Sequence, residues 1–502
     1  MLVINPIFLI VRHIGKNFLL FFLIILFLTF SSLKSAGQDN TLYLIPEIPQ
    51  ANQLNPAYFR LCRVYVELPV IASIRTNIRN TGFGFHDVIE PGTGAQSDIY
   101  FVDFTKIDRR LKNINHAQVA TDVNLLGFSF GLKEWYLTFG IANHSDGLLT
   151  YPHDLLSVRD EFLTIPSPTG KPVNLSSLGA EVTIWNSIGV SAAKEISPGM
   201  KIGIRVKYLQ GMANAITRRT TFLINPITDP AGLQANLRSN LNSSFPVSVG
   251  FDPSGMVNRL DFTNWLDNFA GDYIFNRNRG VAFDAGVVYD YNDETQITAS
   301  ITDLGFIRWK KNINRFSTSG FLFFTDTSLV RFRNVDGNSN LIRSIRDSIS
   351  GSFTSTSKPY TTLTPIKLFG GITHEISPNL RAGAMTRIEI YDLRILPSLT
   401  LSLNYTPVPF LAASVSYTVM NNKFNQIGAG IALGNRVVQF YLTADNIPVR
   451  YMKDNGSALF WPYNARMFSL HTGINLLFGC RDKVKNKGAR KFKSQDYCPA
   501  YD

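Results

Sequence analysis

Apolar and polar residues alternate with a period of two along much of this chain. In residues 201–208, apolar side chains occupy every even position, and charged residues or glycine occupy every odd one. Residues 399–406 and 411–419 repeat the scheme, with serine, threonine, asparagine or alanine between the apolar residues. Because successive side chains of a β-strand point to opposite faces, this pattern predicts strands with one apolar and one polar face.

The composition of the polar face favours a membrane barrel over a soluble β-sandwich. A sandwich exposes this face to bulk water and usually carries many lysines and glutamates there, whereas here small polar residues predominate. Such residues suit the crowded, wet interior of a barrel whose apolar side chains face lipid. Weaker alternation recurs in segments long enough for tilted membrane strands, which need ~9 to 11 residues. These segments are 124–132, 135–143, 182–193, 281–289, 366–374, 380–390, 427–433, 437–445 and 468–478.

The connections between these segments alternate between short and long, as they do in outer-membrane barrels. A switch of the apolar phase between Ile301 and Leu304 also predicts a β-bulge near Asp303. We therefore expect an all-β fold, a transmembrane antiparallel β-barrel of about 14 and at most about 16 strands, with long extracellular loops. Short turns are expected at 196–199, 290–294, 376–379, 406–409 and 434–436, and long connections at 144–180, 209–279, 308–362 and 446–465.

Tyrosine and tryptophan collect near the ends of the predicted strands. Their amphipathic rings suit the depth of the lipid headgroups, so they could form interfacial girdles around the barrel. The residues are Trp135, Trp185, Tyr208, Tyr289, Tyr291, Trp309, Tyr391 and Tyr405.

The first 37 residues have the order of a secretory signal peptide. Bases at 12–16 precede an apolar run at 18–30, and small residues follow at 35–37. An uncleaved anchor helix is the alternative, but the run is shorter than the ~18 to 20 apolar residues that a membrane helix needs. We expect cleavage near Gly37, a lumen segment at 38–61, a barrel at 62–479 and a location in the cell outer membrane.

A basic tail at 480–502 accounts for part of the net charge of +12. The tail could contact anionic lipid or a protein partner in the periplasm, or it could be a solvated end. A disulfide bond between Cys480 and Cys498 could close it into a loop. Cys62 would then remain as a buried free thiol.

Several classes of protein are excluded by composition and motifs. With 45% hydrophobic and 17% charged residues the chain is not intrinsically disordered, and it contains nothing like a nucleic-acid-binding module. Its histidines and cysteines lack the spacing of metal sites, so we expect no metal and no cofactor. His144 and His153, with Ser145, Asp146 and Asp154, could imitate a hydrolase site, but these residues fall in a predicted loop. We expect no catalytic residues and no enzyme.

A short motif, Asn55-Pro56-Ala57-Tyr58, precedes the first predicted strand. It resembles the amino-terminal segments of the long-chain fatty-acid transporter family, of the barrel component of the type nine secretion system, and of Bacteroidota gliding and secretion barrels. The chain is most similar to an uncharacterised Bacteroidota outer-membrane family, also through residues 303–306 and 473–476. In the fatty-acid transporters the segment before the first strand folds inward as a plug and the barrel has fourteen strands, and the resemblance implies both features here.

Charged residues on the predicted inner face are the best candidates for function. They could line a route through the lumen, clamp the plug through carboxylates such as Glu47, or form pairs that only fill the barrel. The first hypothesis is passage of a small hydrophobic ligand through a plugged barrel in outer-membrane lipid. The second is a scaffold whose loops or tail dock periplasmic or surface proteins of secretion or motility. The lumen candidates are Lys201, Arg205, Lys207, Arg381, Arg387, Glu389 and His471.

Overall fold

The structure is a computed structural model in which the placed residues lie between Asn40 and Cys480. The expected signal peptide at 1–37, the tail beyond Cys480 and the side chain of Cys498 lie outside the described residues. The described ranges are 40–59, 62–68, 73–84, 89–91, 100–102, 104–156, 171–228, 231–245, 248–251, 257–261, 278–325, 353–391, 394–408, 410–420, 423–435, 437–447, 451–453, 460–462 and 467–480.

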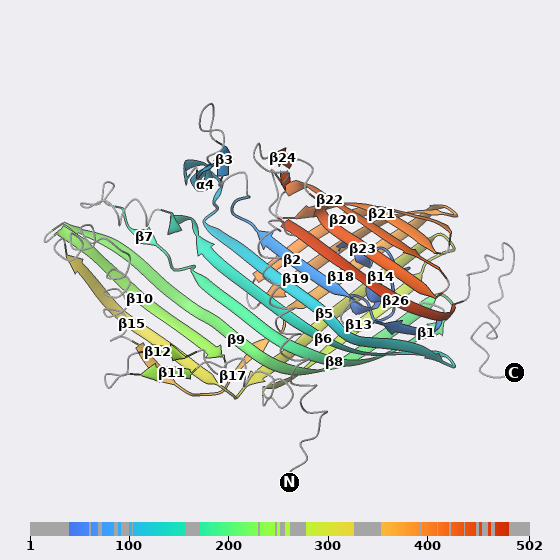
Figure 1. The fold of residues 1–502 in the computed structure, drawn as a ribbon, viewed down its shortest axis with the longest axis horizontal. Coiled ribbons are helices and arrows are strands. Elements are labelled where there is room, and N and C mark those ends of the chain that lie inside the picture. The colour runs from blue at the N-terminus through green and yellow to red at the C-terminus, as the bar shows by residue number, and fades with distance from the viewer. Residues whose placement is uncertain are drawn as a thin grey trace, which may run out of the picture.

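Within these ranges, fourteen antiparallel strands form a closed β-barrel, which confirms the expected fold class (Figure 1). The first wall strand is in two pieces, β1 (Cys62–Glu67) and β2 (Ile74–Asn80), and both pieces pair with β5 and with the last strand, β26. This pairing closes the wall. The other wall strands are β5 (Ile114–Leu132), β6 (Trp135–Pro152), β8 (Gly179–Ser197), β9 (Met200–Thr228), β13 (Arg279–Asp290), β14 (Thr295–Trp309), β18 (Ile366–Ser377), β19 (Leu380–Tyr391), β20 (Arg394–Val408), β21 (Leu411–Met420), β22 (Lys423–Gly434), β23 (Val438–Ile447) and β26 (Met467–Cys480).

A sheet extends the wall beyond the barrel, at the left of Figure 1. The far half of β9 pairs with β10 (Ala231–Ser244), and β10 pairs with β15 (Ile313–Thr325). The expectation of a long connection from residue 209 was wrong in part, because β9 continues to Thr228. Similarly, β6 continues to Pro152, so His144 lies in a strand and not in a loop.

The remaining elements are short. No helix in the described part of the chain is long and apolar enough to cross a membrane. The helices are α2 (Asn40–Tyr43), η1 (Pro49–Gln53), α4 (Phe104–Arg110) and η3 (His153–Leu155), and the minor strands are β3 (Ile89–Pro91), β4 (Tyr100–Val102), β7 (Val173–Asn174), β11 (Ser248–Phe251), β12 (Val257–Asp261), β16 (Phe353–Thr356), β17 (Tyr360–Leu363), β24 (Tyr451–Lys453) and β25 (Phe460–Pro462).

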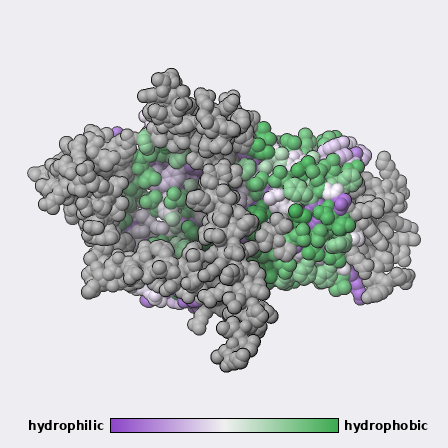
Figure 2. All heavy atoms as spheres, in the orientation of Figure 1, coloured by the Kyte–Doolittle hydropathy of each residue, from purple (hydrophilic) through white to green (hydrophobic). Residues whose placement is uncertain are grey.

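The alternation in the sequence separates the two faces of the wall. On β9, Ile204 and Val206 are 59% and 50% exposed, whereas Arg205 and Lys207 between them are buried. Hydrophobic residues accordingly cover most of the coloured surface of the barrel, at the right of Figure 2. The apolar face is therefore the outer, lipid-facing one, and the charged residues face the lumen.

A β-bulge interrupts the pairing of β13 with β14, as the change of apolar phase predicted. Phe283 pairs with Leu304 and Ala285 with Ile301, so two residues of β14 lie opposite Asp284. One of them is Asp303, whose backbone has a positive φ of 61°. The bulge brings the Asp303 carboxylate to the inner face, where it accepts a hydrogen bond from Lys207 at 2.6 Å.

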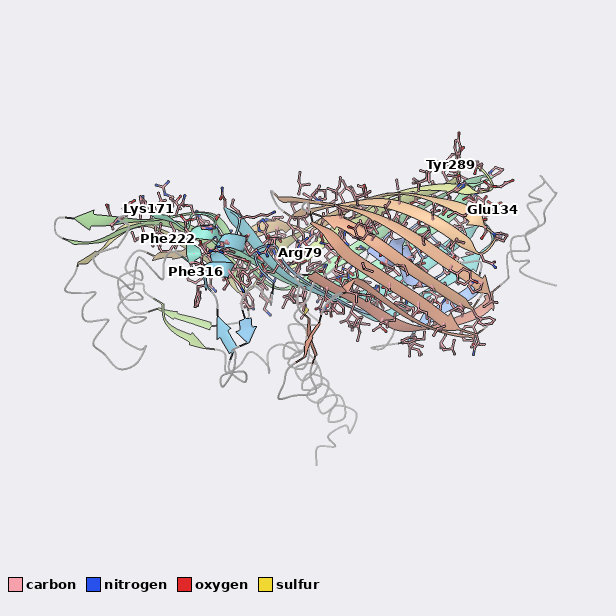
Figure 3. The ribbon with its side chains drawn as sticks, turned by 90° about the horizontal axis from the view of Figure 1, so that it is seen from above. Arg79, Glu134, Lys171, Phe222, Tyr289 and Phe316 are labelled. Carbon is pink, nitrogen blue, oxygen red and sulfur yellow. The ribbon has the colours of Figure 1, made fainter. Side chains whose placement is uncertain are left out.

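Only some of the residues expected in the aromatic girdles are exposed on the outside of the barrel. Trp135, Tyr208, Tyr289, Tyr291 and Tyr405 are exposed on the outer surface or at the turns. Figure 3 shows Tyr289 at the same end of the barrel as Glu134, away from Lys171 and Phe222. For three residues the expectation was wrong, because their side chains are buried on the inner face: Trp185, Trp309 and Tyr391.

Placing a charge on the outer face should destabilise the folded barrel in lipid. For Val206→Arg we expect a loss of about 2 to 4 kcal/mol in the free energy of unfolding from vesicles, because a guanidinium near the bilayer midplane loses its hydration. Val437→Arg is a matched control, since Val437 is similarly exposed at 45% but lies in the turn before β23. Equal losses for the two variants would contradict a lipid-facing position for Val206.

Candidate functional site

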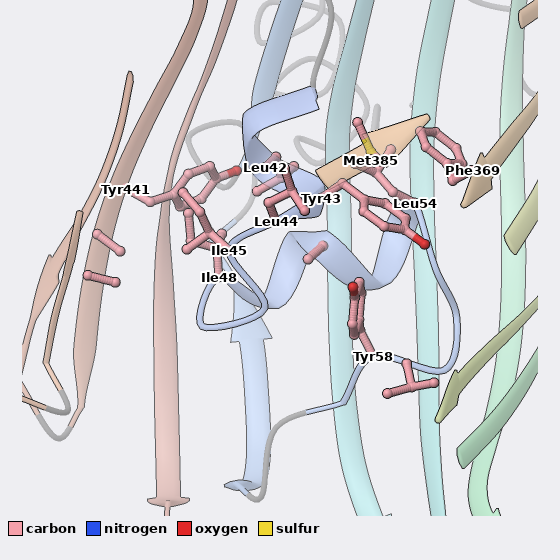
Figure 4. Close-up of a cluster of buried hydrophobic side chains, with 14 of the residues drawn as sticks. Leu42, Tyr43, Leu44, Ile45, Ile48, Leu54, Tyr58, Phe369, Met385 and Tyr441 are labelled. Atoms are coloured by element: carbon pink, nitrogen blue, oxygen red, sulfur yellow. The ribbon is translucent and has the colours of Figure 1, made fainter. Parts of the chain in front are cut away.

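The segment before the first strand lies inside the barrel and fills part of its lumen. We call residues 40–58 the plug; it comprises α2, η1 and the turns around them (Figure 4). Its apolar side chains form one buried cluster with side chains of six wall strands. Within this cluster the ring of Tyr43 stacks on Phe369 at 5.0 Å and meets the edge of Tyr58 at 5.5 Å. The plug is therefore part of the hydrophobic core of the barrel.

The Asn55-Pro56-Ala57-Tyr58 motif is a docking element of the plug. The buried Asn55 amide donates hydrogen bonds to the carbonyl oxygens of Val287 at 3.3 Å and Ala299 at 3.4 Å. Its side-chain oxygen accepts a hydrogen bond from the Ala57 N–H at 2.9 Å, which fixes the turn. The motif thus joins the plug to β13 and β14 through main-chain groups of the wall.

Two glycines of the wall form the surface on which this motif rests. Gly203 of β9 and Gly286 of β13 lie directly opposite each other in the sheet. A Cβ added at Gly203 would overlap the carbonyl group of Pro56, and one added at Gly286 would overlap the amide oxygen of Asn55. Glycine is required at both positions because the plug backbone approaches the wall too closely for a side chain.

Three of the seven lumen candidates contact the plug or the residue that follows it. Arg381 pairs with Glu47. Arg205 donates a hydrogen bond to the carbonyl oxygen of Asn52 at 2.8 Å, and its guanidinium also pairs with Asp284 at 3.0 Å. The ammonium of Lys201 lies 5.3 Å from the ring centroid of Phe59. Charged wall residues on two separate strands, β9 and β19, therefore hold the plug.

The other four lumen candidates contact wall residues. Lys207 lies between Asp284 at 2.8 Å and Asp303 at 2.6 Å. Arg387 pairs with Glu389 at 3.3 Å. His471 is hydrogen-bonded to Ser73 at 2.6 Å and to Tyr441 at 3.0 Å. The contacts of Lys207 and His471 link different strands on the inner face, whereas Arg387 and Glu389 both belong to β19.

Beside the plug lies a cavity of about 120 Å³. Its lining combines apolar residues of the plug and the wall with charged and polar groups of the wall. The four basic residues of the lining are each in an ion pair, as Arg205 is with Asp284 and Arg75 with Asp122, whereas Glu67 is hydrogen-bonded to Tyr65 and Asn124. An apolar cavity of ~150 Å³ in another protein holds one benzene molecule, so this space suits a molecule of about that size. The apolar lining includes Ile48, Leu54, Phe59, Phe139 and Ile141.

Asp122, His144 and Ser187 form a row in the wall of this cavity that the sequence did not reveal. The hydrolase arrangement considered for His144 paired it with Ser145 and Asp146, and this was wrong in geometry. His144 instead lies between Asp122 of β5 and Ser187 of β8. The pairing of β5 with β6 shifts register between Asn124 and Leu126, which places Asp122 opposite His144. That shift leaves no signal in the sequence pattern.

Comparison with known proteins assigns a family. The profile of a family of unknown function, DUF5723, matches residues 56–445. The chain belongs to this family. No curated protein matches it. The DUF5723 match begins inside the plug, at Pro56, and ends in β23. The expected links to Bacteroidota and to type nine secretion stay predictions.

Several solved structures are similar to the DUF5723 chain. A deletion mutant of the monoaromatic hydrocarbon channel TodX has a TM-score of 0.40 and 11% identity, over 89% of this chain and 95% of that one. The Pseudomonas putida toluene transporter TodX has a TM-score of 0.37 and 9% identity, over 89% and 94%. A Pseudomonas aeruginosa FadL homologue has a TM-score of 0.38 and 10% identity, over 88% and 96%.

Substituting the glycine under the plug should loosen the plug without breaking the barrel. For Gly203→Ala we expect faster amide hydrogen exchange in residues 40–58, because overpacking costs about 1 to 3 kcal/mol and the clash is with the Pro56 backbone. Gly370→Ala on β18 is the matched control, since an added Cβ there meets nothing within 4 Å. Unchanged exchange of the plug in Gly203→Ala, measured by mass spectrometry, would contradict the docking described here.

Proposed function

We propose that the protein is a plugged outer-membrane channel for small apolar molecules. The observation that carries this proposal is the cavity of about 120 Å³ between the plug and the wall of a closed barrel. A barrel of fourteen strands encloses more space than the inward side chains of its wall fill. The plug occupies much of that space, and the cavity beside it is the remaining room for a solute.

The lining of the cavity supports an apolar solute. Leu54 of the plug, Phe59 directly after the plug and Phe139 of β6 supply apolar groups to the lining. The four basic residues of the lining are each engaged in an ion pair across strands, so none offers an uncompensated positive charge to an ionic ligand. A molecule without charge can enter without breaking these pairs, whereas an ion would have to compete with them.

The way in which the plug contacts the wall supports the proposal that the plug moves as a unit. Many specific hydrogen bonds join it to the wall, such as Glu47 to Arg381, Gln50 to Asn475 at 2.6 Å and Tyr43 to Thr298 at 3.1 Å. A hydrogen bond to a charged group contributes about 1.5 to 3 kcal/mol. Breaking one tie should shift the plug toward an open position while the wall, held by its own ladder of hydrogen bonds, stays intact.

Removal of the plug should open the lumen. We expect a variant lacking residues 40–58 to conduct ions steadily in planar bilayers, whereas the intact chain shows rare openings. Arg381→Ala should lie between them, with openings about ten times more frequent, because a loss of about 1.4 kcal/mol changes a population tenfold. Uptake of a labelled monocyclic aromatic hydrocarbon by intact cells should rise in the same order.

Lys194→Ala is the control for loss of a positive charge. Lys194 pairs with Glu134 at 2.5 Å at the β5–β6 turn, outside the lumen. The hydrogen bond and the charge of Lys194 lower the pKa of Glu134. Exposed pairs contribute little to stability, and we expect wild-type conductance. A closed lumen after plug deletion, or equal effects of Arg381→Ala and Lys194→Ala, would refute the channel.

A further inference from the structure

Three polar side chains from neighbouring strands are aligned along one wall of the cavity. His144 Nε2 lies 2.8 Å from Ser187 Oγ, and His144 Nδ1 is hydrogen-bonded to a carboxylate oxygen of Asp122. All three residues line the cavity beside the plug. A hydroxyl, an imidazole and a carboxylate connected in this order form the arrangement that activates a serine nucleophile.

The surroundings hold the imidazole in the orientation that this chemistry needs. The His144 ring stacks on Trp185 at 5.0 Å with an interplanar angle of 21°. Arg75 pairs with Asp122, so the carboxylate is held from the side opposite the imidazole. With Asp122 accepting the hydrogen bond from Nδ1–H, Nε2 is left as the acceptor for the Ser187 hydroxyl.

We propose that Ser187, His144 and Asp122 form a serine-hydrolase site that cleaves esters of small apolar acids within the lumen. Ser187 and His144 are the catalytic residues, and Asp122 is a positioning residue that acts through His144. This activity goes beyond transport and does not depend on the plug moving.

The reaction follows from the arrangement of the three side chains. Ser187 Oγ attacks the ester carbonyl carbon while its proton passes to His144 Nε2. As the tetrahedral intermediate collapses, the bond to the alcohol oxygen breaks and His144 returns the proton to the departing alcohol. Water, deprotonated by His144, then attacks the acyl carbon; the bond to Ser187 Oγ breaks, and His144 returns the proton to that oxygen. The products are one carboxylic acid and one alcohol.

The wall also provides a hydrogen-bond donor near the nucleophile. Gly189 follows Ser187 by two residues on the same face of β8 and lies opposite Lys207 of β9. Gly189 has no side chain, so the aliphatic part of Lys207 can pack over this position. A Cβ added at Gly189 would lie 3.5 Å from Lys207 Cγ. Lys207 also lines the cavity. Its ammonium has three N–H donors, and with two of them directed to Asp284 and Asp303 the third can donate to the negative oxygen that develops on the substrate.

The substrate class follows from the size and lining of the site. A cavity of about 120 Å³ admits a short acyl chain or a single ring and excludes a diacyl phospholipid. Apolar residues such as Leu126 and Phe139 lie in the same lining as Ser187. A short acyl ester would place its apolar part there and its carbonyl group at the polar wall.

The test uses the purified, folded chain in detergent with two probes. An alkyl fluorophosphonate should form a covalent adduct that mass spectrometry maps to Ser187, and p-nitrophenyl butyrate should be hydrolysed above the detergent blank. Mapping the adduct on the wild-type chain needs no variant. No adduct, or an adduct on another residue, would overturn the proposal.

Variants separate catalysis from packing. Ser187→Ala should abolish labelling and lower hydrolysis by at least about 100-fold, whereas Ser191→Ala should leave both unchanged, because Ser191 is buried on the same face of β8. Asp122→Asn should slow adduct formation by about 100-fold or more, since the amide favours the wrong histidine tautomer. A difference in electrophoretic mobility between heated and unheated samples verifies that each variant has a folded barrel. Equal hydrolysis by Ser187→Ala and the wild type would refute the site and leave the plug-deletion result unaffected.

Discussion

Every backbone N–H and C=O group of a chain in lipid needs a hydrogen-bond partner within the protein, because the bilayer core supplies none. The wall meets this constraint by pairing its last strand with its first, so that no strand edge faces lipid. The two-piece first strand still serves this closure, since β1 and β2 each pair on both sides. The closed wall then dictates the two-faced pattern of side chains, with apolar residues outside and small or charged ones within.

The closed barrel encloses a space that the side chains of the wall do not fill, and the plug occupies part of that space. The apolar residues of the plug complete the hydrophobic core from inside the barrel. The wall has glycine at the positions where the plug approaches it most closely. Gly203 and Gly286 form one such place, and Gly430 opposite Ile45 of the plug forms another. The small residues that mark the inner face in the sequence therefore reflect contact with the plug as well as contact with water.

Much of this fold could be predicted from the sequence because a single period governs it. The alternation in residues 201–208, the phase change near Asp303 and the tight turns are local signals, and the structure has strands, a bulge and turns at these places. The inward positions of Trp185 and Trp309 were missed because aromatic residues at strand ends suit a headgroup layer equally well. The row of Asp122, His144 and Ser187 was missed for a different reason. It depends on how three strands are aligned, and one shift of register between Asn124 and Leu126 decides that alignment.

The plug also constrains the order in which the molecule can assemble. Thr41 bonds with Asp445, and Gln50 bonds with Asn475, 404 and 425 residues further along the chain. Its binding surface is complete only when the last strands have joined the first, and contacts between such distant residues form slowly. The part of the described chain that is synthesised first is thus the last to reach its final position.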